Sequence, residues 1–266
     1  MALRAHRTLS RHTVAGPFSR SNHPGNKSDV RRGAPARSLS WHKAGDGPGS
    51  LHALLEHCAV LLFPLLFVSA LLLSGRGLSQ AGTGWLVIPG ALLGLVFGDF
   101  VTALVHWAAD TYCDERTPVI GQSLVRPFRV HHVRPLEICE HGVVETVGNT
   151  CILAVPLLTL FIAFTAYGET SAASAFAAFT AAVTVGVTVA TNQFHKWAHQ
   201  VAPPRFVRIL QRARIILDPE HHRAHHTAPF KSSYAITNGW LNPLLNRIRF
   251  FQRLEGALRV LGIKPS

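Results

Sequence analysis

The sequence predicts an all-α integral membrane protein with about four transmembrane helices. Two observations lead to this fold class. Of the 266 residues, 48% are hydrophobic and only 15% are charged, a composition too apolar for an ordinary soluble domain. In addition, the chain contains four long apolar stretches, each close to the roughly 20 residues that a helix needs to cross a bilayer.

The four expected spans follow one another in chain order, at residues 51–73, 84–104, 150–167 and 172–194. A single apolar stretch is also compatible with a buried helix in a large soluble protein. Four of them leave no polar-faced helices to form the outside of such a protein, so membrane spans are the better interpretation. We therefore expect a membrane domain over residues 51–266.

The basic residues predict the orientation of the spans. All but one of the 26 Lys and Arg residues lie on one side of a four-span topology, and Arg76 is the exception. By the positive-inside rule, both termini and the loop after the second span are expected in the cytoplasm. Two short turns, at 74–83 and 168–171, then lie on the other side. This topology and anionic lipid head groups account for the positive charge, so we expect no nucleic-acid partner.

The first 50 residues form a basic tail rich in Ser, Gly and Pro, with only Asp29 and Asp46 as acids. Such a composition buries too little apolar surface to fold, so we expect disorder. It is equally typical of organelle targeting peptides, which leaves a bacterial inner membrane and an endomembrane both open. The four cysteines show no paired spacing and are expected to be free thiols.

Ten of the sixteen histidines lie at or beyond the cytoplasmic ends of the expected spans. One isolated histidine is usually a surface or hydrogen-bonded residue, but ten on one face of the membrane indicate a metal centre. We therefore expect a cytoplasmic, histidine-rich metal-binding cap. The ten are His106, His131, His132, His141, His195, His199, His221, His222, His225 and His226.

The spacing of these histidines suits metal ligation. Residues three or four apart share a helix face, so His195 with His199, and His222 with His225 and His226, can each aim two imidazoles at one point. Asp99 and Asp110 lie seven residues before and four after His106, on the same helical stripe. They are candidates to orient or supplement His106, and an acid inside a span, such as Asp99, is by default a functional candidate.

The number of histidines indicates two metal ions, because eight or nine are too many ligands for one ion and suit two ions with four to five ligands each. Zinc needs four ligands, or three and a water, and the HKWAH sequence at 195–199 lacks the glutamate of a zinc protease motif. Imidazole-rich sites suit iron, copper or zinc. We favour two irons, because the nearest substrates at a lipid interface are C–H bonds, which react only with an activated-oxygen oxidant.

Four motifs resemble one known family, in order and with short gaps, from about residue 94 to residue 262. They are GDFVTALVHWAADT at 98–111, RPFRVHHVRPLEICEHGVVET at 126–146, NQFHKWAH at 192–199 and HHRAHHTAPFKSSYAITNGWLN at 221–242. This region is similar to the plasmanylethanolamine desaturases, the Kua/CarF-type histidine-box membrane lipid desaturases. The resemblance implies an iron- and O2-dependent enzyme that converts an alkyl ether phospholipid into the vinyl ether of a plasmalogen.

The resemblance also implies site residues. Nine histidines match motif positions and are the expected metal ligands: His106, His131, His132, His141, His195, His199, His222, His225 and His226. His221 stands just outside the last box and is left out. Asp110, Asp99 and Glu145 are candidates to orient the ligands. Val147 replaces an Asn that is usual in the family, which leaves the exact lipid substrate open.

Several alternatives stay open at the level of sequence. A phospholipid acyl-chain desaturase or a hydroxylase of the same histidine-box type would use the same centre. Rivals of another class are a histidine-rich metal transporter, whose site is expected near the bilayer midplane, and a regulatory membrane protein with a structural metal. The chain has no GxGxxG after a strand and no CxxC cluster. Electrons are therefore expected from a ferredoxin or cytochrome b5-type carrier with its reductase.

Overall fold

The computed structural model describes residues 49–266 apart from 119–120, 122–124 and 169–170. The described residues fold into α-helices and short 3₁₀-helices joined by loops, with no strand among them. The all-α prediction is therefore confirmed. The predicted disordered tail, which ends at residue 50, lies almost entirely outside the described residues.

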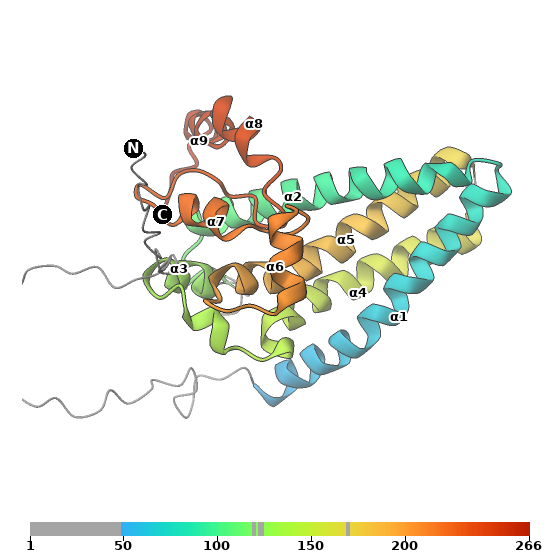
Figure 1. Cartoon of the computed structure of the whole chain (residues 1–266), viewed down its shortest axis with the longest axis horizontal. Coiled ribbons are helices and arrows are strands. Elements are labelled where there is room, and N and C mark those ends of the chain that lie inside the picture. The colour runs from blue at the N-terminus through green and yellow to red at the C-terminus, as the bar shows by residue number, and fades with distance from the viewer. Residues whose placement is uncertain (1–48, 119–120, 122–124, 169–170) are drawn as a thin grey trace, which may run out of the picture.

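Four long helices lie side by side and form one half of the molecule (Figure 1). Each is long and apolar enough to cross a membrane, which confirms the prediction of four spans. In chain order they are α1 (Ser50–Gln80), α2 (Val87–Thr111) with the short helix η1 (Gly84–Leu86) before it, α4 (Val143–Tyr167) and α5 (Ala172–His199).

The outward faces of these helices are apolar. Leu61, Leu65 and Leu72 on α1 are largely exposed, as are Ile88 on α2 and Leu160 on α4. Large aliphatic side chains in such number on the outside of a bundle are suited to lipid rather than water. The four long helices therefore form the membrane-spanning half of an integral membrane protein.

Helix α5 is the centre of the bundle and packs against α1, α2 and α4. Its contact with α2 depends on glycines at every fourth position, Gly90, Gly94 and Gly98. A Cβ atom at Gly94 would lie 2.6 Å from the side chain of Val183 on α5. Small residues spaced in this way allow two helix backbones to approach closely, which is a common packing mode inside membranes.

Several helix ends differ from the sequence prediction. The turn expected at 74–83 is much shorter, because α1 continues to Gln80. Tertiary packing favours the longer helix: Leu78 is completely buried, and a Cβ atom at Gly77 would lie 3.1 Å from Ala175 of α5. At the other end of the bundle, α2 and α5 continue past the predicted ends at 104 and 194. These extra turns carry His106, Asp110 and the two histidines of HKWAH.

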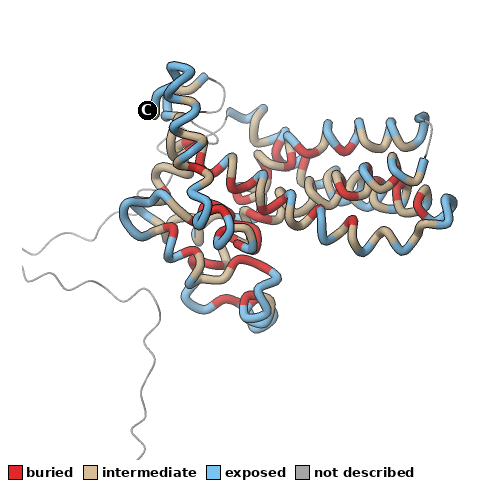
Figure 2. The backbone as a smooth tube through the Cα atoms, turned by 90° about the horizontal axis from the view of Figure 1, so that it is seen from above, coloured by how far each residue is buried: buried red, intermediate tan, exposed pale blue. Residues whose placement is uncertain are grey.

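Shorter helices form a cap over one end of the bundle (Figure 1). They are α3 (Arg126–Val133), η3 (Glu137–Glu140), α6 (Arg205–Arg212), α7 (Pro219–His225), α8 (Asn242–Arg247) and α9 (Phe250–Val260). An aromatic cluster of Trp107, Tyr234 and Phe251 attaches the C-terminal helices to the end of α2. Buried segments gather where the bundle meets the cap (Figure 2), and the histidines lie in this region.

Candidate metal centre

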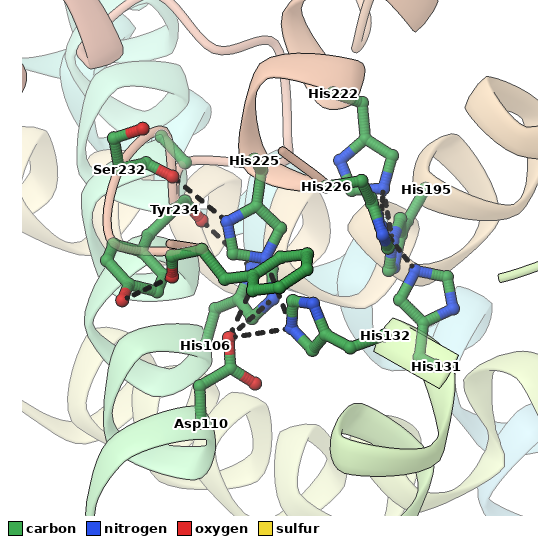
Figure 3. Close-up of polar contacts among 12 residues, drawn as sticks. His106, Asp110, His131, His132, His195, His222, His225, His226, Ser232 and Tyr234 are labelled. Atoms are coloured by element: carbon green, nitrogen blue, oxygen red, sulfur yellow. Dashed lines mark hydrogen bonds and ion pairs between the residues drawn. The ribbon is translucent and has the colours of Figure 1, made fainter. Parts of the chain in front are cut away.

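Two groups of side chains at the junction of bundle and cap can each hold a metal ion. In each group, the candidate ligand atoms lie within 4.8 Å of one another. The five-histidine group consists of His131, His195, His199, His222 and His226. The mixed group consists of His106, Asp110, His132 and His225. Figure 3 labels all members of the two groups except His199 and shows them side by side. The rings of His132 and His226, which belong to different groups, are 5.1 Å apart.

Two of the three His-His pairs at the site divide between the two groups. On α3, His131 belongs to the five-histidine group and His132 to the mixed group; at the end of α7, His226 and His225 divide in the same way. Neighbouring residues on a helix point about 100° apart, so adjacent histidines can serve two adjacent ions. Helices α3 and α7 thus contribute to both groups, whereas α2 contributes only to the mixed group and α5 only to the five-histidine group.

The sequence predicts that His222 with His225 and His226 can aim two imidazoles at one point, and the structure shows which two do so. His222 and His226 do so, with ring centroids 4.6 Å apart, but His225 belongs to the mixed group and its ring lies 5.9 Å from that of His222. A helix rotates by about 400° over four residues and by about 300° over three. Relative to His222, His226 is therefore rotated by about 40° in one direction and His225 by about 60° in the other.

The five-histidine group converges on one nitrogen, Nε2 of His222. Three other Nε2 atoms lie close to it, those of His199 at 2.6 Å, His195 at 2.9 Å and His226 at 3.0 Å. A neutral imidazole nitrogen offers either one N–H or one lone pair, so hydrogen bonds to a single nitrogen cannot satisfy three others. A cation among the four lone pairs would satisfy them together, and the donor set therefore fits a metal ion.

The mixed group is arranged around the carboxylate of Asp110. Its Oδ2 atom lies 3.0 Å from Nε2 of His132, 3.4 Å from Nε2 of His106 and 3.6 Å from Nε2 of His225. The sequence predicted Asp110 as an orienting partner of His106. Its position among the three Nε2 atoms also qualifies it as a direct ligand.

Backbone carbonyls orient two histidines of the mixed group (Figure 3). Nδ1 of His106 lies 3.2 Å from the carbonyl oxygen of Tyr234, and Nδ1 of His225 lies 3.0 Å from that of Ser232. A carbonyl oxygen only accepts hydrogen bonds, so both Nδ1 atoms must donate. Their Nε2 atoms then carry the lone pairs, which is the tautomer that a metal site requires.

Asp99 holds the loop that supplies these carbonyls. Its completely buried carboxylate accepts hydrogen bonds from the backbone N–H groups of Thr237, Asn238, Gly239 and Leu241, at 3.1 to 3.2 Å. Gly239 has a φ of +73°, a left-handed conformation that favours glycine. The sequence predicted Asp99 as a residue that orients or supplements His106 on the same helical stripe. Seven residues of helix, however, separate the two by about 10 Å. Asp99 instead fixes the 232–241 loop.

A chain of buried hydroxyl groups fixes the same loop to the bundle. The Oγ1 atom of Thr237 lies 3.0 Å from that of Thr102 on α2 and 2.7 Å from that of Thr191 on α5. Asn242 holds the preceding turn through two hydrogen bonds with the backbone of Ala235. In the sequence, the closely spaced Thr and Asn residues at 237–242 are the only signal for this support.

Burial keeps the cap histidines in the form that binds metal. It lowers the pKa of His225 to about 4 and that of His226 to about 3, and it lowers the pKa values of His131 and His222 as well. Neighbouring histidines lower each of these four pKa values further. The imidazoles are therefore neutral near pH 7, which leaves lone pairs available for coordination.

Three residues considered from the sequence, His141, His221 and Glu145, lie outside both ligand groups among the described residues. His141, predicted as a ligand, lines a cavity beside the five-histidine group, so its ligation stays a prediction. Glu145 lines the same cavity and accepts a hydrogen bond from the backbone of Gly142 at the start of α4.

All four cysteines are free thiols, as expected.

The fold and the site define a four-span membrane protein with paired histidine-rich groups suited to two metal ions. The family model of the lipid desaturase domain matches residues 95–266, which includes both groups. The chain belongs to the lipid desaturase family. It is therefore an integral membrane oxidoreductase that acts on lipids.

Two relatives and one more distant protein place the chain within this family. It is 41% identical to a plasmanylethanolamine desaturase of Myxococcus xanthus over 76% of this chain and 70% of the relative. It is 35% identical to plasmanylethanolamine desaturase 1 of Mus musculus over 91% and 93%. The chloroplastic fatty acid desaturase 4 of Arabidopsis thaliana is 28% identical over 65% and 52%. No solved structure matches the chain significantly.

Proposed function

We propose that this lipid desaturase uses iron and O2 to introduce the vinyl ether double bond of plasmalogens into alkyl ether phospholipids. The observation that carries the redox chemistry is the convergence of two adjacent ligand groups at the membrane boundary. The choice of an ether lipid rests on the relatives: the two that are 41% and 35% identical are plasmanylethanolamine desaturases, whereas a fatty acid desaturase is 28% identical.

The two groups would hold about two irons per chain, because imidazole with carboxylate is a donor set that suits iron. The five-histidine group would hold one ion and the mixed group the other. Asp110 is the only carboxylate in either group among the described residues. His141 is the remaining predicted histidine, and its position at the cavity leaves it close enough to the five-histidine group to be tested as a ligand.

Bound iron would supply the activation of O2 that saturated C–H bonds require. Forming the double bond removes one hydrogen from each of two neighbouring carbons, and O2 is reduced to two water molecules with two further electrons and two protons. Those electrons require an external carrier, for which we propose a ferredoxin or cytochrome b5-type protein with its reductase. The chain itself contributes the orientation of the ligands, through the carbonyls of Ser232 and Tyr234.

The depth of the site in the membrane suits a reaction at the carbon–carbon bond next to the ether oxygen of the lipid. The histidines lie where the long helices meet the cap, so the centre lies near the head-group layer when the bundle spans the membrane. In an alkyl ether lipid, the bond next to the ether oxygen lies close to the glycerol and hence near that layer. A site at the midplane, as expected for a transporter, would not face this bond.

The proposal includes the orientation of the protein in the membrane. The described basic residues gather at the cap end, and Arg76 lies near the far end of α1. By the positive-inside rule, the cap and both termini face the cytoplasm. A soluble electron carrier would then reach the metal centre directly. Reporters that are active only in the cytoplasm, fused to each end, should both be active; a silent reporter at either end would contradict this orientation.

The function is tested by expressing the chain in a host that makes alkyl ether phospholipids but no vinyl ethers. We expect new acid-labile lipids that release long-chain aldehydes, formed only when O2 is present. The His222→Ala variant, present in the membrane at the same level, should form none. Lipid mass spectrometry before and after mild acid treatment makes this measurement.

Other products would redirect the assignment. A new double bond in an acyl chain would keep the metal centre and replace the ether lipid with a phospholipid acyl chain as substrate. A hydroxylated lipid would replace desaturation with hydroxylation. No lipid change under active electron supply would contradict the proposed reaction and favour a transport or regulatory role.

A further inference from the structure

A cavity opens beside the five-histidine group, between α3, η3 and the cap ends of α4 and α5. Its lining includes His131 and His195, both of the five-histidine group, and two charged residues, Arg134 and Glu137. Part of the lining is apolar, including Phe128. A ligand in this cavity could therefore contact both a candidate metal-binding histidine and a pair of opposite charges.

Glu137 has an unsatisfied acceptor at this cavity. Its Oε2 atom is buried and has no hydrogen-bond partner within the described part of the chain. It forms an ion pair with Nη1 of Arg134 at 4.0 Å, which is beyond hydrogen-bonding distance. The Arg134 side chain is 61% exposed, so it can turn to another partner. A buried carboxylate oxygen without a donor is costly. The Glu137 side chain as a whole is 17% exposed, so a small turn of its carboxylate toward a ligand N–H group in the cavity would remove this cost.

A phosphoethanolamine head group has the complementary chemistry. Its primary ammonium carries three N–H donors for Glu137, and its phosphate oxygens accept from the guanidinium of Arg134. A choline head group has a positive charge but no N–H, so it would leave the buried oxygen of Glu137 unpaired. Glu137 therefore distinguishes two head groups of equal charge through hydrogen bonding rather than through charge.

The geometry also connects this charged pair to the metal centre. Arg134 follows His131 by three residues, at the end of the same short helix α3. Only the glycerol separates the phosphate of an ether phospholipid from its ether oxygen. A lipid whose head group contacts Arg134 and Glu137 would thus place its ether bond toward His131 and His195.

We propose that this cavity is the head-group subsite of the enzyme, in which Glu137 receives the ammonium and Arg134 the phosphate of an ethanolamine phospholipid. The inference rests on the proposed function, because it places the reacting lipid at the same metal centre. Glu137 is then the residue that determines selectivity for ethanolamine over choline.

The test compares Glu137→Gln with the matched control Glu140→Gln. Both residues lie on η3, but Glu140 is exposed and lies outside this cavity. Membranes containing each protein receive alkyl ether lipids with an ethanolamine or a choline head group, and KM and kcat are measured for each lipid. We expect Glu137→Gln to raise KM for the ethanolamine lipid about tenfold and to lose the preference over choline, at unchanged kcat and iron content. Glu140→Gln should behave as the wild type.

Arg134→Gln is the second variant and should raise KM for both lipids alike, because both carry a phosphate. An exposed arginine of α6 is its control: Arg208→Gln should leave both KM values unchanged. Unchanged selectivity in Glu137→Gln, or a loss of kcat and iron together, would overturn the head-group assignment.

A second measurement is independent of turnover. A carbodiimide joins a carboxylate to a nearby primary amine and takes up the water that is released. We expect an ethanolamine-lipid adduct on Glu137, found by peptide mass spectrometry, and none with choline lipid. Absence of that adduct from wild-type protein would contradict the proposal. An adduct on Glu137 without any vinyl ether product would keep the head-group subsite and remove the proposed reaction.

Discussion

The two ligand groups differ in how their imidazoles are held. In the mixed group, backbone carbonyls fix the Nδ1 atoms of His106 and His225, and Asp99 fixes the loop that provides them. In the five-histidine group, the Nδ1 atom of His222 has no hydrogen-bond partner among the described residues, and the same holds for Nδ1 of His132 in the mixed group. The protein thus orients two of the three histidines of the mixed group in advance, whereas His222, at the centre of the five-histidine group, depends more on the metal itself. The two sites should respond differently to loss of their supports.

The largest effect is expected from His222→Ala, which removes the nitrogen on which the five-histidine group converges. Activity should fall to background, and iron per chain should fall with it. His221→Ala is the matched control: it lies next to His222 on the same helix but in neither group. Substantial activity in His222→Ala, or equal losses in both variants, would contradict the central position of His222.

The next largest effect is expected from Asp110→Asn, which removes the charge from the mixed group and keeps its shape. Because Asp110 contacts three histidines there, activity should fall by at least the 10- to 100-fold that is typical of residues supporting a metal site. Iron analysis separates two cases. Loss of about one iron per chain would indicate a direct ligand, and full iron content with low activity would indicate an orienting role. Unchanged activity would exclude both.

A smaller effect is expected from Asp99→Asn, which acts on the mixed group only through the 232–241 loop. The amide of Asn keeps one acceptor oxygen, but its NH2 group replaces the other oxygen and faces backbone N–H groups that also donate. Hydrogen bonds to that position are then lost. Hydrogen bonds to a charged group contribute roughly 1.5–3 kcal/mol each, so the melting temperature should fall and activity should fall about tenfold. Full activity at an unchanged melting temperature would show that the loop does not need this carboxylate.

Among the nine histidines predicted as ligands, the smallest effect is expected from His141→Ala. Because His141 lies outside both groups, iron per chain should stay unchanged and activity should fall only through the altered cavity. Metal analysis of the purified variant decides the point. A loss of iron equal to that of His222→Ala would make His141 the ninth histidine ligand, as the sequence motifs predicted.

The four spans and most of the candidate ligands could be predicted from the sequence. Apolar runs identify spans directly, because lipid requires a continuous apolar surface. Eight of the nine predicted histidines lie in the two groups. The cap-side ends of α2 and α5 were set too early, because His106 and HKWAH lower the hydropathy although the backbone stays helical.

The division into two groups could not be read from the sequence. It depends on which way α3 and α7 face, and that is set by tertiary packing rather than by spacing within each motif. The function of Asp99 was hidden for a different reason. Its partners are backbone N–H groups, which every residue except proline possesses, so no pattern of side chains marks them. The carbonyl partners of His106 and His225 were hidden in the same way.

Metal analysis of the purified wild-type protein tests the central claim most directly, namely that two adjacent groups form a two-iron centre. Iron is quantified per chain by elemental analysis, together with zinc and copper. We predict about two irons per chain, because the two groups together provide eight imidazoles and one carboxylate. One zinc per chain and no iron, in protein that is active or was purified with added iron, would contradict the account.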